Sequence, residues 1–294
     1  MGKKVAVVLL VALIALALGL RLYRVMESRL HGKVSGPSHT ETSSPAPSPG
    51  TGASSETGPA ASSSAKGSGV APLEFTPRSG EVLDFSANVT KLNSTVANLQ
   101  VKVGERRSVA GKNAWHLQAF AHTENPYRMV FELDDQFDSY SELANLASLQ
   151  YEMHLSERGQ KVDTIQRMMS SSKEPAPANA AAARVLPGTR DPIGMLMYLR
   201  SVDWEKTREV RSPVFDGHKL YDVRAVLVAK GQSVSVPVGK FTTNKIELHV
   251  LDNGTEMKDA HFWLHIADGG ERLPVFMEAV LPFATAHVEL TKVH

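Results

Sequence analysis

Apolar and polar residues alternate in short stretches along most of the chain. Between Lys245 and Val250, and again over residues 82–89 and 149–155, every second side chain is apolar. A period of two is typical of a strand that buries one face. Asn-Gly and Gly-Gly pairs stand between such stretches, and hairpin turns need residues that tolerate positive φ. The pattern therefore predicts successive short strands joined by tight turns.

Several boundaries follow from this pattern. We expect a hairpin around Asp134-Asp135, a turn at 157–160, and one strand from Val236 to Val250 within the four strands of residues 234–290. Because no helical pattern separates most of these strands, they favour an antiparallel meander, and hence a barrel, a part-barrel or a sandwich.

One segment has the signature of a helix. Asp191 is a good N-cap, and Pro192 takes the first helical position, where its missing N–H costs nothing. The residues that follow, to about 201, are apolar nearly all round, whereas a surface helix has a polar back. We therefore expect a helix that is enclosed by a curved sheet.

Two roles stay open for this helix, which are plain core packing and lining a cavity for an apolar ligand. Methionine side chains suit either role because they are flexible and adapt to irregular space. The candidate lining residues are Ile193, Met195, Leu196, Met197, Tyr198, Trp263 and Phe276. The predicted fold class is mainly β: an antiparallel meander that forms an open or partial β-barrel around one apolar helix at about 191–201.

The N-terminal residues 1–31 are predicted to be a targeting segment. An uncharged apolar run over 5–20 follows Lys3 and Lys4 and precedes Arg21. This is typical of a signal peptide, and flanking residues lengthen the run toward the 20 or so that span a bilayer. We expect an uncleaved membrane anchor, with the folded part outside the cytoplasm. The alternatives are secretion after signal cleavage and a buried soluble helix.

The rest of the chain divides by composition. Residues 32–71 are mostly Ser, Gly, Pro, Ala and Thr, which cannot bury enough apolar surface to fold, so we expect a disordered linker. Residues 72–294 form the expected β-rich domain. Residues 170–186 are a second low-complexity stretch, which we expect to be a mobile loop, with a short helix through 180–183 as the alternative.

Composition excludes several classes of function. The 32 Lys and Arg nearly balance the 31 Asp and Glu, which argues against a nucleic-acid partner. The absence of cysteine excludes disulfides, thiolate nucleophiles, sulfur-ligated zinc and iron–sulfur clusters. His261 and His265 share a strand face about 13 Å apart, too far to hold one metal. The remaining histidines, including those at 116 and 154, fit exposed positions. We expect no catalytic residues, no cofactor and no metal site.

The folded region resembles the bacterial family known as domain of unknown function 3108. The resemblance is carried by residues 80–85, the helix at 191–200, and the segments 236–243, 262–264 and 272–275, in this order and spacing. It implies an exported or envelope-anchored β-rich domain similar to the open barrels of lipoprotein carriers. The family defines no catalytic residues.

These observations favour a non-enzymatic module, tethered to a membrane of the bacterial envelope, that binds a lipid or another apolar ligand. The alternative is a structural or protein-interaction domain of the envelope with a fully packed core. The expected partners are the membrane, through the N-terminal segment, and a lipid or an envelope protein.

Overall fold

The computed structural model describes residues 75–294 except 91, 93, 172–176 and 283. The predicted anchor at 1–31 and linker at 32–71 lie outside the described residues. Within that described part, no helix combines the length and the apolar character that crossing a bilayer requires.

Strands account for most of the described chain, with one α-helix and one short 3₁₀ turn. The elements are β1 (Val82–Val89), β2 (Ser94–Val103), β3 (Arg107–Val109), β4 (Lys112–Thr123), η1 (Tyr127–Met129), β5 (Asp134–Glu142), β6 (Ser148–Glu157), β7 (Gln160–Met169), β8 (Ala181–Arg184), α2 (Pro192–Ser201), β9 (Glu209–Phe215), β10 (Leu220–Val236), β11 (Gly239–Asp252), β12 (Thr255–Glu256), β13 (His261–Ala267), β14 (Pro274–Val280) and β15 (Thr285–Val293).

The described strands form a single sheet of 15 strands. Its order is β8-β7-β6-β5-β4-β2-β1-β15-β14-β13-β11-β10-β9, with β3 and β12 paired to β4 and β11. Only the β7–β8 pair is parallel. The first strand pairs with the last, so β1 and β15 join the two halves of the chain. The predicted antiparallel meander is confirmed, and the sheet stays open because β8 and β9 are edges.

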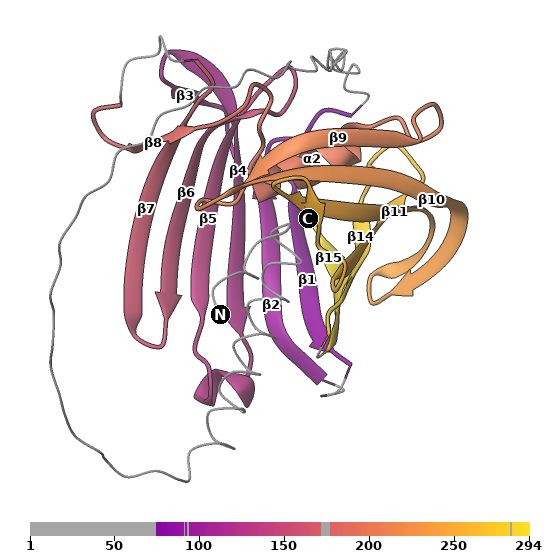
Figure 1. Ribbon diagram of the computed structural model, residues 1–294. Coiled ribbons are helices and arrows are strands. Elements are labelled where there is room, and N and C mark those ends of the chain that lie inside the picture. The colour runs from indigo at the N-terminus through magenta and orange to yellow at the C-terminus, as the bar shows by residue number, and fades with distance from the viewer. Residues whose placement is uncertain (1–74, 91, 93, 172–176, 283) are drawn as a thin grey trace, which may run out of the picture.

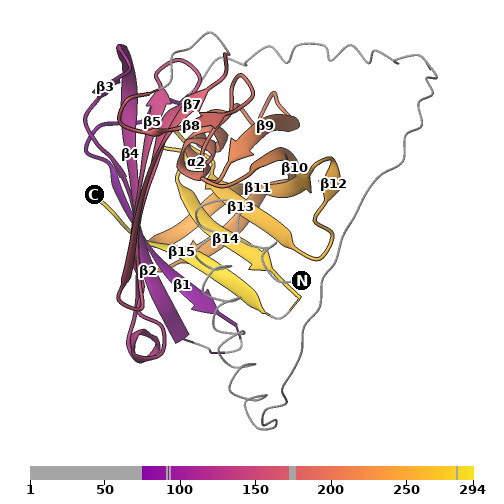
Figure 2. The same cartoon turned by 60° about the vertical axis from the view of Figure 1, so that its left-hand side comes forward.

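The sheet bends into two walls. Figure 1 shows β4–β7 as a broad wall, and Figure 2 shows that wall nearly edge-on with β10–β15 turned away from it. The helix α2 follows β8 and precedes β9, so it connects the two edges of the sheet. It contacts β4, β5 and β9. The helix therefore lies between the walls, near one end of the trough.

The sequence accounts for both ends of α2. Asp191 caps its start by accepting a hydrogen bond from the Gly194 N–H at 2.8 Å. Ser148 Oγ donates to the other carboxylate oxygen of Asp191 at 2.6 Å, which fixes the cap on β6. All ten residues of the helix are buried. The prediction of an enclosed helix that begins at Pro192 is confirmed.

A buried ion pair holds the other end of the helix. Both terminal nitrogens of Arg200 donate to the carboxylate of Glu81 at 2.8 Å, and the side chains are 0% and 3% exposed. The same guanidinium donates to the backbone oxygens of Glu271 and Arg272. Arg200 thus connects α2, the start of β1 and the turn before β14.

Contacts between side chains and backbone join the turn after the edge strand β9 to strands β6 and β7. Gln166 Nε2, on β7, donates at 2.6 Å to the backbone oxygen of Gly217 in the β9–β10 turn. A Cβ atom at Gly217 would lie 2.4 Å from the Met153 side chain of β6. The β9–β10 turn therefore packs directly on β6 and β7, although no strand pairing closes the barrel there.

Two predicted hairpin boundaries are wrong. Asp134 and Asp135 begin β5, and η1 precedes them. Arg128 forms ion pairs with Glu132 and Asp134, so this acidic segment folds onto η1 and does not turn back as a hairpin. The expected strand from Val236 to Val250 also fails, because Val236 pairs with Gly239 across a tight turn that separates β10 from β11.

Two further segments differ from expectation. The alanine run at 180–183, for which a helix was the alternative, contributes to β8, since its backbone pairs with β7. The edge strand β9 was not predicted, because Pro213 interrupts its apolar pattern. Proline is tolerated at a sheet edge, where no second partner needs its missing N–H.

Candidate functional site

The strands β4–β7 carry polar side chains on the face turned away from the core. His116, Tyr140, Gln150 and Arg167 lie opposite one another in register across these four strands. Leu117 and Tyr151, which neighbour His116 and Gln150 in the chain, point to the opposite face and are buried in the core. We call the face that carries His116 the polar face.

The first row of the polar face is held by ring stacking and hydrogen bonds. The His116 and Tyr140 rings are stacked at 4.7 Å. Arg167 donates to Gln150 Oε1 from Nε at 3.0 Å and from Nη2 at 2.6 Å. Burial, together with the nearby carboxylate of Glu152, raises the pKa of Tyr140 to about 12. Tyr140 therefore stays neutral over the physiological range.

A buried carboxylate occupies the second row. Asp138 accepts hydrogen bonds from His116 Nε2 at 2.6 Å, Gln118 Nε2 at 2.8 Å and Gln136 Nε2 at 2.7 Å. Burial alone would raise the pKa of Asp138, but these hydrogen bonds lower it below its ordinary value. Asp138 is therefore an ionised carboxylate whose side chain is only 5% exposed.

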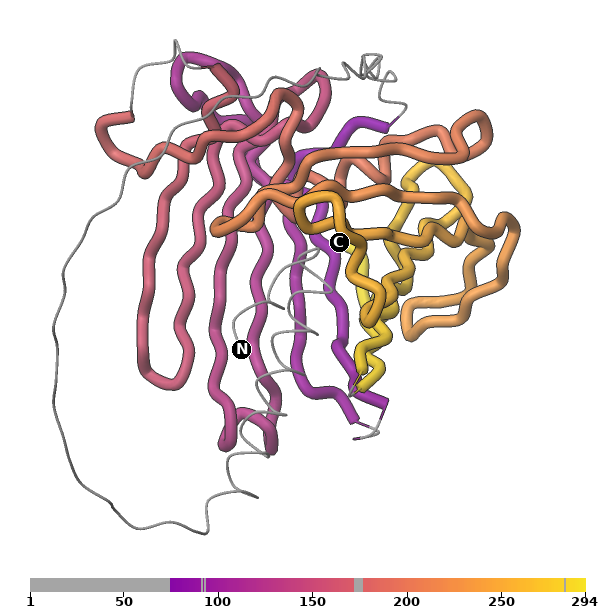
Figure 3. The backbone as a smooth tube through the Cα atoms, viewed as in Figure 1, coloured from indigo at the N-terminus to yellow at the C-terminus, as the bar shows by residue number. Residues whose placement is uncertain are grey.

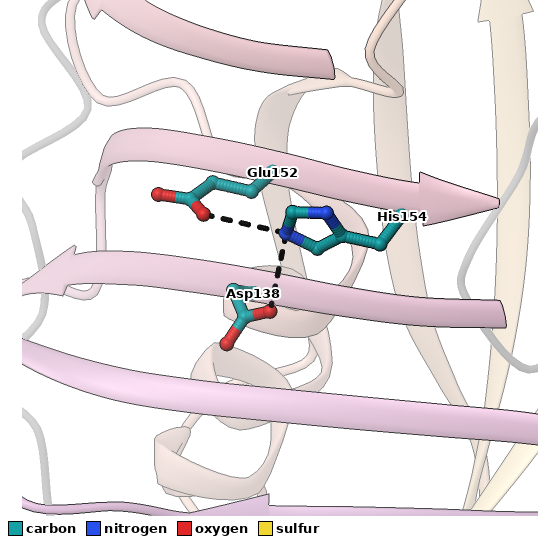
Figure 4. Close-up of side chains that lie close together, drawn as sticks. All are labelled: Asp138, Glu152 and His154. Carbon is teal, nitrogen blue, oxygen red and sulfur yellow. Dashed lines mark ion pairs between the residues drawn. The ribbon is translucent and has the colours of Figure 1, made fainter. Parts of the chain in front are cut away.

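Glu152 and His154 lie beside Asp138 (Figure 4). His154 Nε2 is 3.5 Å from a Glu152 oxygen and 4.0 Å from an Asp138 oxygen, while its Nδ1 is 2.7 Å from Asp163 Oδ1. The hydrogen bond with Asp163 raises the pKa of His154, although partial burial opposes the rise. One nitrogen and two carboxylate oxygens of Asp138, Glu152 and His154 thus lie within 4.8 Å of one another.

A groove of about 1110 Å³ borders the first row. Figure 3 shows that β3 and the segment around β8 meet at the same end of the β5–β7 wall, where the groove lies. Its polar lining includes Arg107, His116, Tyr140, Gln150 and Arg167. Its apolar lining comes from Leu149, Met168, Met169, Val185 and Leu186.

The groove carries an excess of positive charge. Lys112 pairs with Glu142 at 3.2 Å, and Glu142 is the one carboxylate of the lining. Among the described residues, neither Arg107 nor Arg167 forms an ion pair with a carboxylate. The groove thus combines two uncompensated guanidinium groups with an apolar wall.

The structure separates the residues that the sequence selects as ligand-lining. Ile193, Met195, Leu196, Met197 and Tyr198 lie together in the buried core. Trp263 and Phe276 are half-buried and lie on the other face of β13 and β14, where Lys245 covers Trp263 and His265 meets Phe276 edge-on. None of the seven lines the groove described above.

Sequence reasoning missed both the groove and the carboxylate–histidine cluster. Glu152 and His154 are two apart on one strand, which places them on one face, but Asp138 joins them only through the β5–β6 register. The predicted hairpin did place residues 136–143 on a strand, but the pattern along one strand does not give its register against the next.

Solved structures of three bacterial proteins are similar to this chain at low identity. A β-barrel-like protein of domain of unknown function DUF1849 from Brucella abortus is 10% identical, with a TM-score of 0.46, over 73% of this chain and 97% of that one. A candidate lipoprotein from Parabacteroides distasonis is 11% identical, with a TM-score of 0.35, over 76% and 99% of the two chains.

A candidate exported protein from Bacteroides fragilis with a YmcC-like fold is 8% identical, with a TM-score of 0.34, over 76% of this chain and 100% of that one. No curated protein matches the sequence. The family described as "Protein of unknown function (DUF3108)" matches residues 84–291, which is most of the described domain. The chain therefore belongs to the DUF3108 family.

Proposed function

We propose that this domain is a non-catalytic binding module for an amphiphilic ligand, with an apolar chain and an anionic head group such as a fatty acid or a phospholipid carries. The observation that carries the proposal is the lining of the groove, where two guanidinium groups without carboxylate partners face the same space as a set of apolar side chains.

The polar end of the groove suits an anion. Guanidinium groups bind carboxylate and phosphate oxygens through paired N–H donors. Arg107 is exposed, and Arg167 is held in place by Gln150, so one cation is free to adjust and the other is pre-positioned. A neutral apolar ligand would leave both charges without a partner.

The apolar end of the groove suits a hydrocarbon chain. Leu186 is 57% exposed, and it lines the groove together with half-buried Leu149 and Val185. The volume of about 1110 Å³ is at the upper end of ordinary ligand pockets. A ligand that covers Leu186 would remove this side chain from water.

The location of the module is part of the proposal. The apolar run at 5–20 and the linker at 32–71 support attachment to a membrane, with the β domain on the far side from the cytoplasm. A tethered module with an amphiphile groove would hold a lipid close to the membrane from which it came.

A second candidate is a structural or protein-interaction domain of the envelope. It is favoured by the dense core, in which the helix residues Ile193 to Leu199 are at most 6% exposed. In that case the groove would receive a side chain or segment of another envelope protein.

Titration with a fluorescent fatty acid tests the binding function. The full chain, kept in solution by an amphipathic polymer, is titrated with dansyl-undecanoic acid, and a dansyl-labelled alcohol of the same length serves as the neutral probe. We expect saturable binding of the acid. We also expect Arg107→Glu and Leu186→Asn each to weaken it about tenfold, which corresponds to 1.4 kcal/mol.

Matched variants lie outside the groove. Val162→Asn removes an apolar side chain that is 52% exposed, and Arg211→Glu reverses a charge on β9. Neither should change the affinity, and Arg107→Glu should weaken the acid more than the alcohol. The absence of saturable binding, or equal effects of groove and control variants, would overturn the proposal in favour of the structural role.

A further inference from the structure

The cluster of Asp138, Glu152 and His154 lies on the polar face next to the groove, and the amphiphile does not account for it. Asp138 on β5 is directly opposite Glu152 on β6, and His154 follows two residues later on the same face. Figure 4 shows the imidazole ring pointing toward both carboxylates.

The two carboxylates lack a compensating side chain of fixed positive charge. Their side chains are 5% and 14% exposed, and among the described residues no Lys or Arg forms an ion pair with either. Like charges directly opposite on neighbouring strands repel, and partial burial strengthens that repulsion. Hydrogen bonds from His116, Gln118 and Gln136 offset part of the charge on Asp138, and a cation between or beside the oxygens would offset the rest.

The Nε2 atom of His154 approaches the two carboxylates only loosely. The distances from Nε2 to the carboxylate oxygens, 3.5 and 4.0 Å, exceed the roughly 2.7–3.2 Å of an N–H···O hydrogen bond. They are close to the distance between two ligand atoms of one metal ion, because ligands about 2.1 Å from a tetrahedral metal lie roughly 3.4 Å apart. Small side-chain rotations would bring all three ligand atoms to bonding distance of one ion.

Hydrogen bonds orient each of the three groups. Asp163 lies 2.7 Å from His154 Nδ1, so the Nδ1 proton is held there, and in the neutral ring the Nε2 lone pair faces the carboxylates. Gln118 and Gln136 donate to Asp138, and Gln150 donates to Glu152. This outer layer of partners is the arrangement that fixes ligands around protein-bound metals.

We propose that Asp138, Glu152 and His154 bind a divalent transition-metal cation, for which Zn²⁺ is the best match. Imidazole nitrogen and carboxylate oxygen are both zinc ligands, whereas a histidine disfavours Mg²⁺ and Ca²⁺, which take oxygen ligands. Three protein ligands leave a fourth position for water. The proposal does not rest on the amphiphile function, since no ligand of the ion needs the groove to be occupied.

Isothermal titration of the metal-free full chain with Zn²⁺ tests the site. We expect one saturable site in the unmodified protein, a loss of at least about 100-fold in affinity for Glu152→Gln and for His154→Ala, and a loss of about 10- to 100-fold for Asp163→Asn, which removes only the orienting partner. The same titration with Ca²⁺ should show no binding at this site.

His249→Ala is the matched control. His249 also lies beside two glutamates, but Glu247 approaches its Nε2 at 3.7 Å and Glu256 contacts its Nδ1, so the two carboxylates do not gather at one ring nitrogen. This variant should bind Zn²⁺ like the unmodified chain. Thermal melting without metal checks that each variant is folded. No Zn²⁺ binding by the unmodified chain, or unchanged binding by folded Glu152→Gln, would overturn the proposal and leave His154 as an ion-pair residue.

Discussion

At the residue scale, His265 should make the stability of the fold depend on pH. Its ring is nearly buried between Thr243 and Phe276, and Nδ1 is 3.1 Å from Thr243 Oγ1. The Thr243 hydroxyl already donates to the backbone oxygen of Gln232, so it accepts the Nδ1 proton. Burial, helped by the charge of Lys245, lowers the pKa of His265 to about 4.

Stability should therefore fall in mild acid. The unfolded chain takes up a proton on His265 near its ordinary pKa of about 6.5, and the folded chain resists protonation down to about 4. The unfolded state thus binds more protons in this window. We expect the free energy of unfolding to decrease as the pH falls from 6.5 to 4, as measured by urea denaturation at a series of pH values.

Replacing this histidine isolates its contribution. His265→Gln should flatten the decrease between pH 6.5 and 4, whereas His261→Gln, at an exposed position of the same strand, should leave it as in the unmodified chain. An equal slope in the two variants would show that other groups cause the acid sensitivity.

At the scale of elements, α2 depends on its two polar ends, because its sides are apolar all round. Asp191 fastens the first turn to Ser148, and Arg200 fastens the last turn to Glu81. An apolar helix could slide or rotate between apolar walls at little cost. The buried hydrogen bonds therefore set its register.

Removing the carboxylate partner of Arg200 should strongly destabilise the fold. In Glu81→Gln the guanidinium stays buried without its counter-charge, and we expect a loss of about 3–5 kcal/mol in the free energy of unfolding. Glu271→Gln breaks the exposed pair with Arg78, and its loss should stay below about 1 kcal/mol. Urea denaturation at neutral pH compares them, and similar losses would contradict the anchoring role of Arg200.

Sequence patterns predicted the elements better than their boundaries. The alternation in β1, β6 and the second half of β11 reports directly on which face is buried, and the Asp-Pro start of α2 is a local capping signal. The start of β5 was predicted wrongly because Asp134 forms an ion pair with Arg128. The alternation of apolar and polar residues does not encode such a contact between side chains. Alanines 181–183 join β8 by backbone pairing with β7, and Ala183 also packs in the core.

For a related reason, the candidate site could not be predicted from the sequence. The groove needs the β3–β4 connection, the ends of β5–β7 and residues 185–189 to meet, and the metal cluster needs the register of β5 against β6. Both are long-range consequences of the fold. The sequence instead pointed to the helix, whose apolar residues the structure places in the core.

At the scale of the whole molecule, the sheet forms an open trough with its helix between the walls. The β9–β10 turn rests on β7 through the Gln166–Gly217 hydrogen bond, and the helix α2 is fully buried in the core. The groove lies outside this core, at one end of the first wall. A ligand held there could enter and leave without unfolding the trough.

The most direct test of this account maps where an amphiphile binds. The full chain is irradiated with a diazirine-bearing fatty acid, with and without excess unlabelled fatty acid, and the adducts are located by peptide mass spectrometry. We predict adducts that the competitor suppresses, concentrated in residues 167–170 and 185–189 and reduced in Leu186→Asn. Adducts concentrated in Pro192–Ser201, or labelling that the competitor leaves unchanged, would contradict the placement of the ligand in the groove.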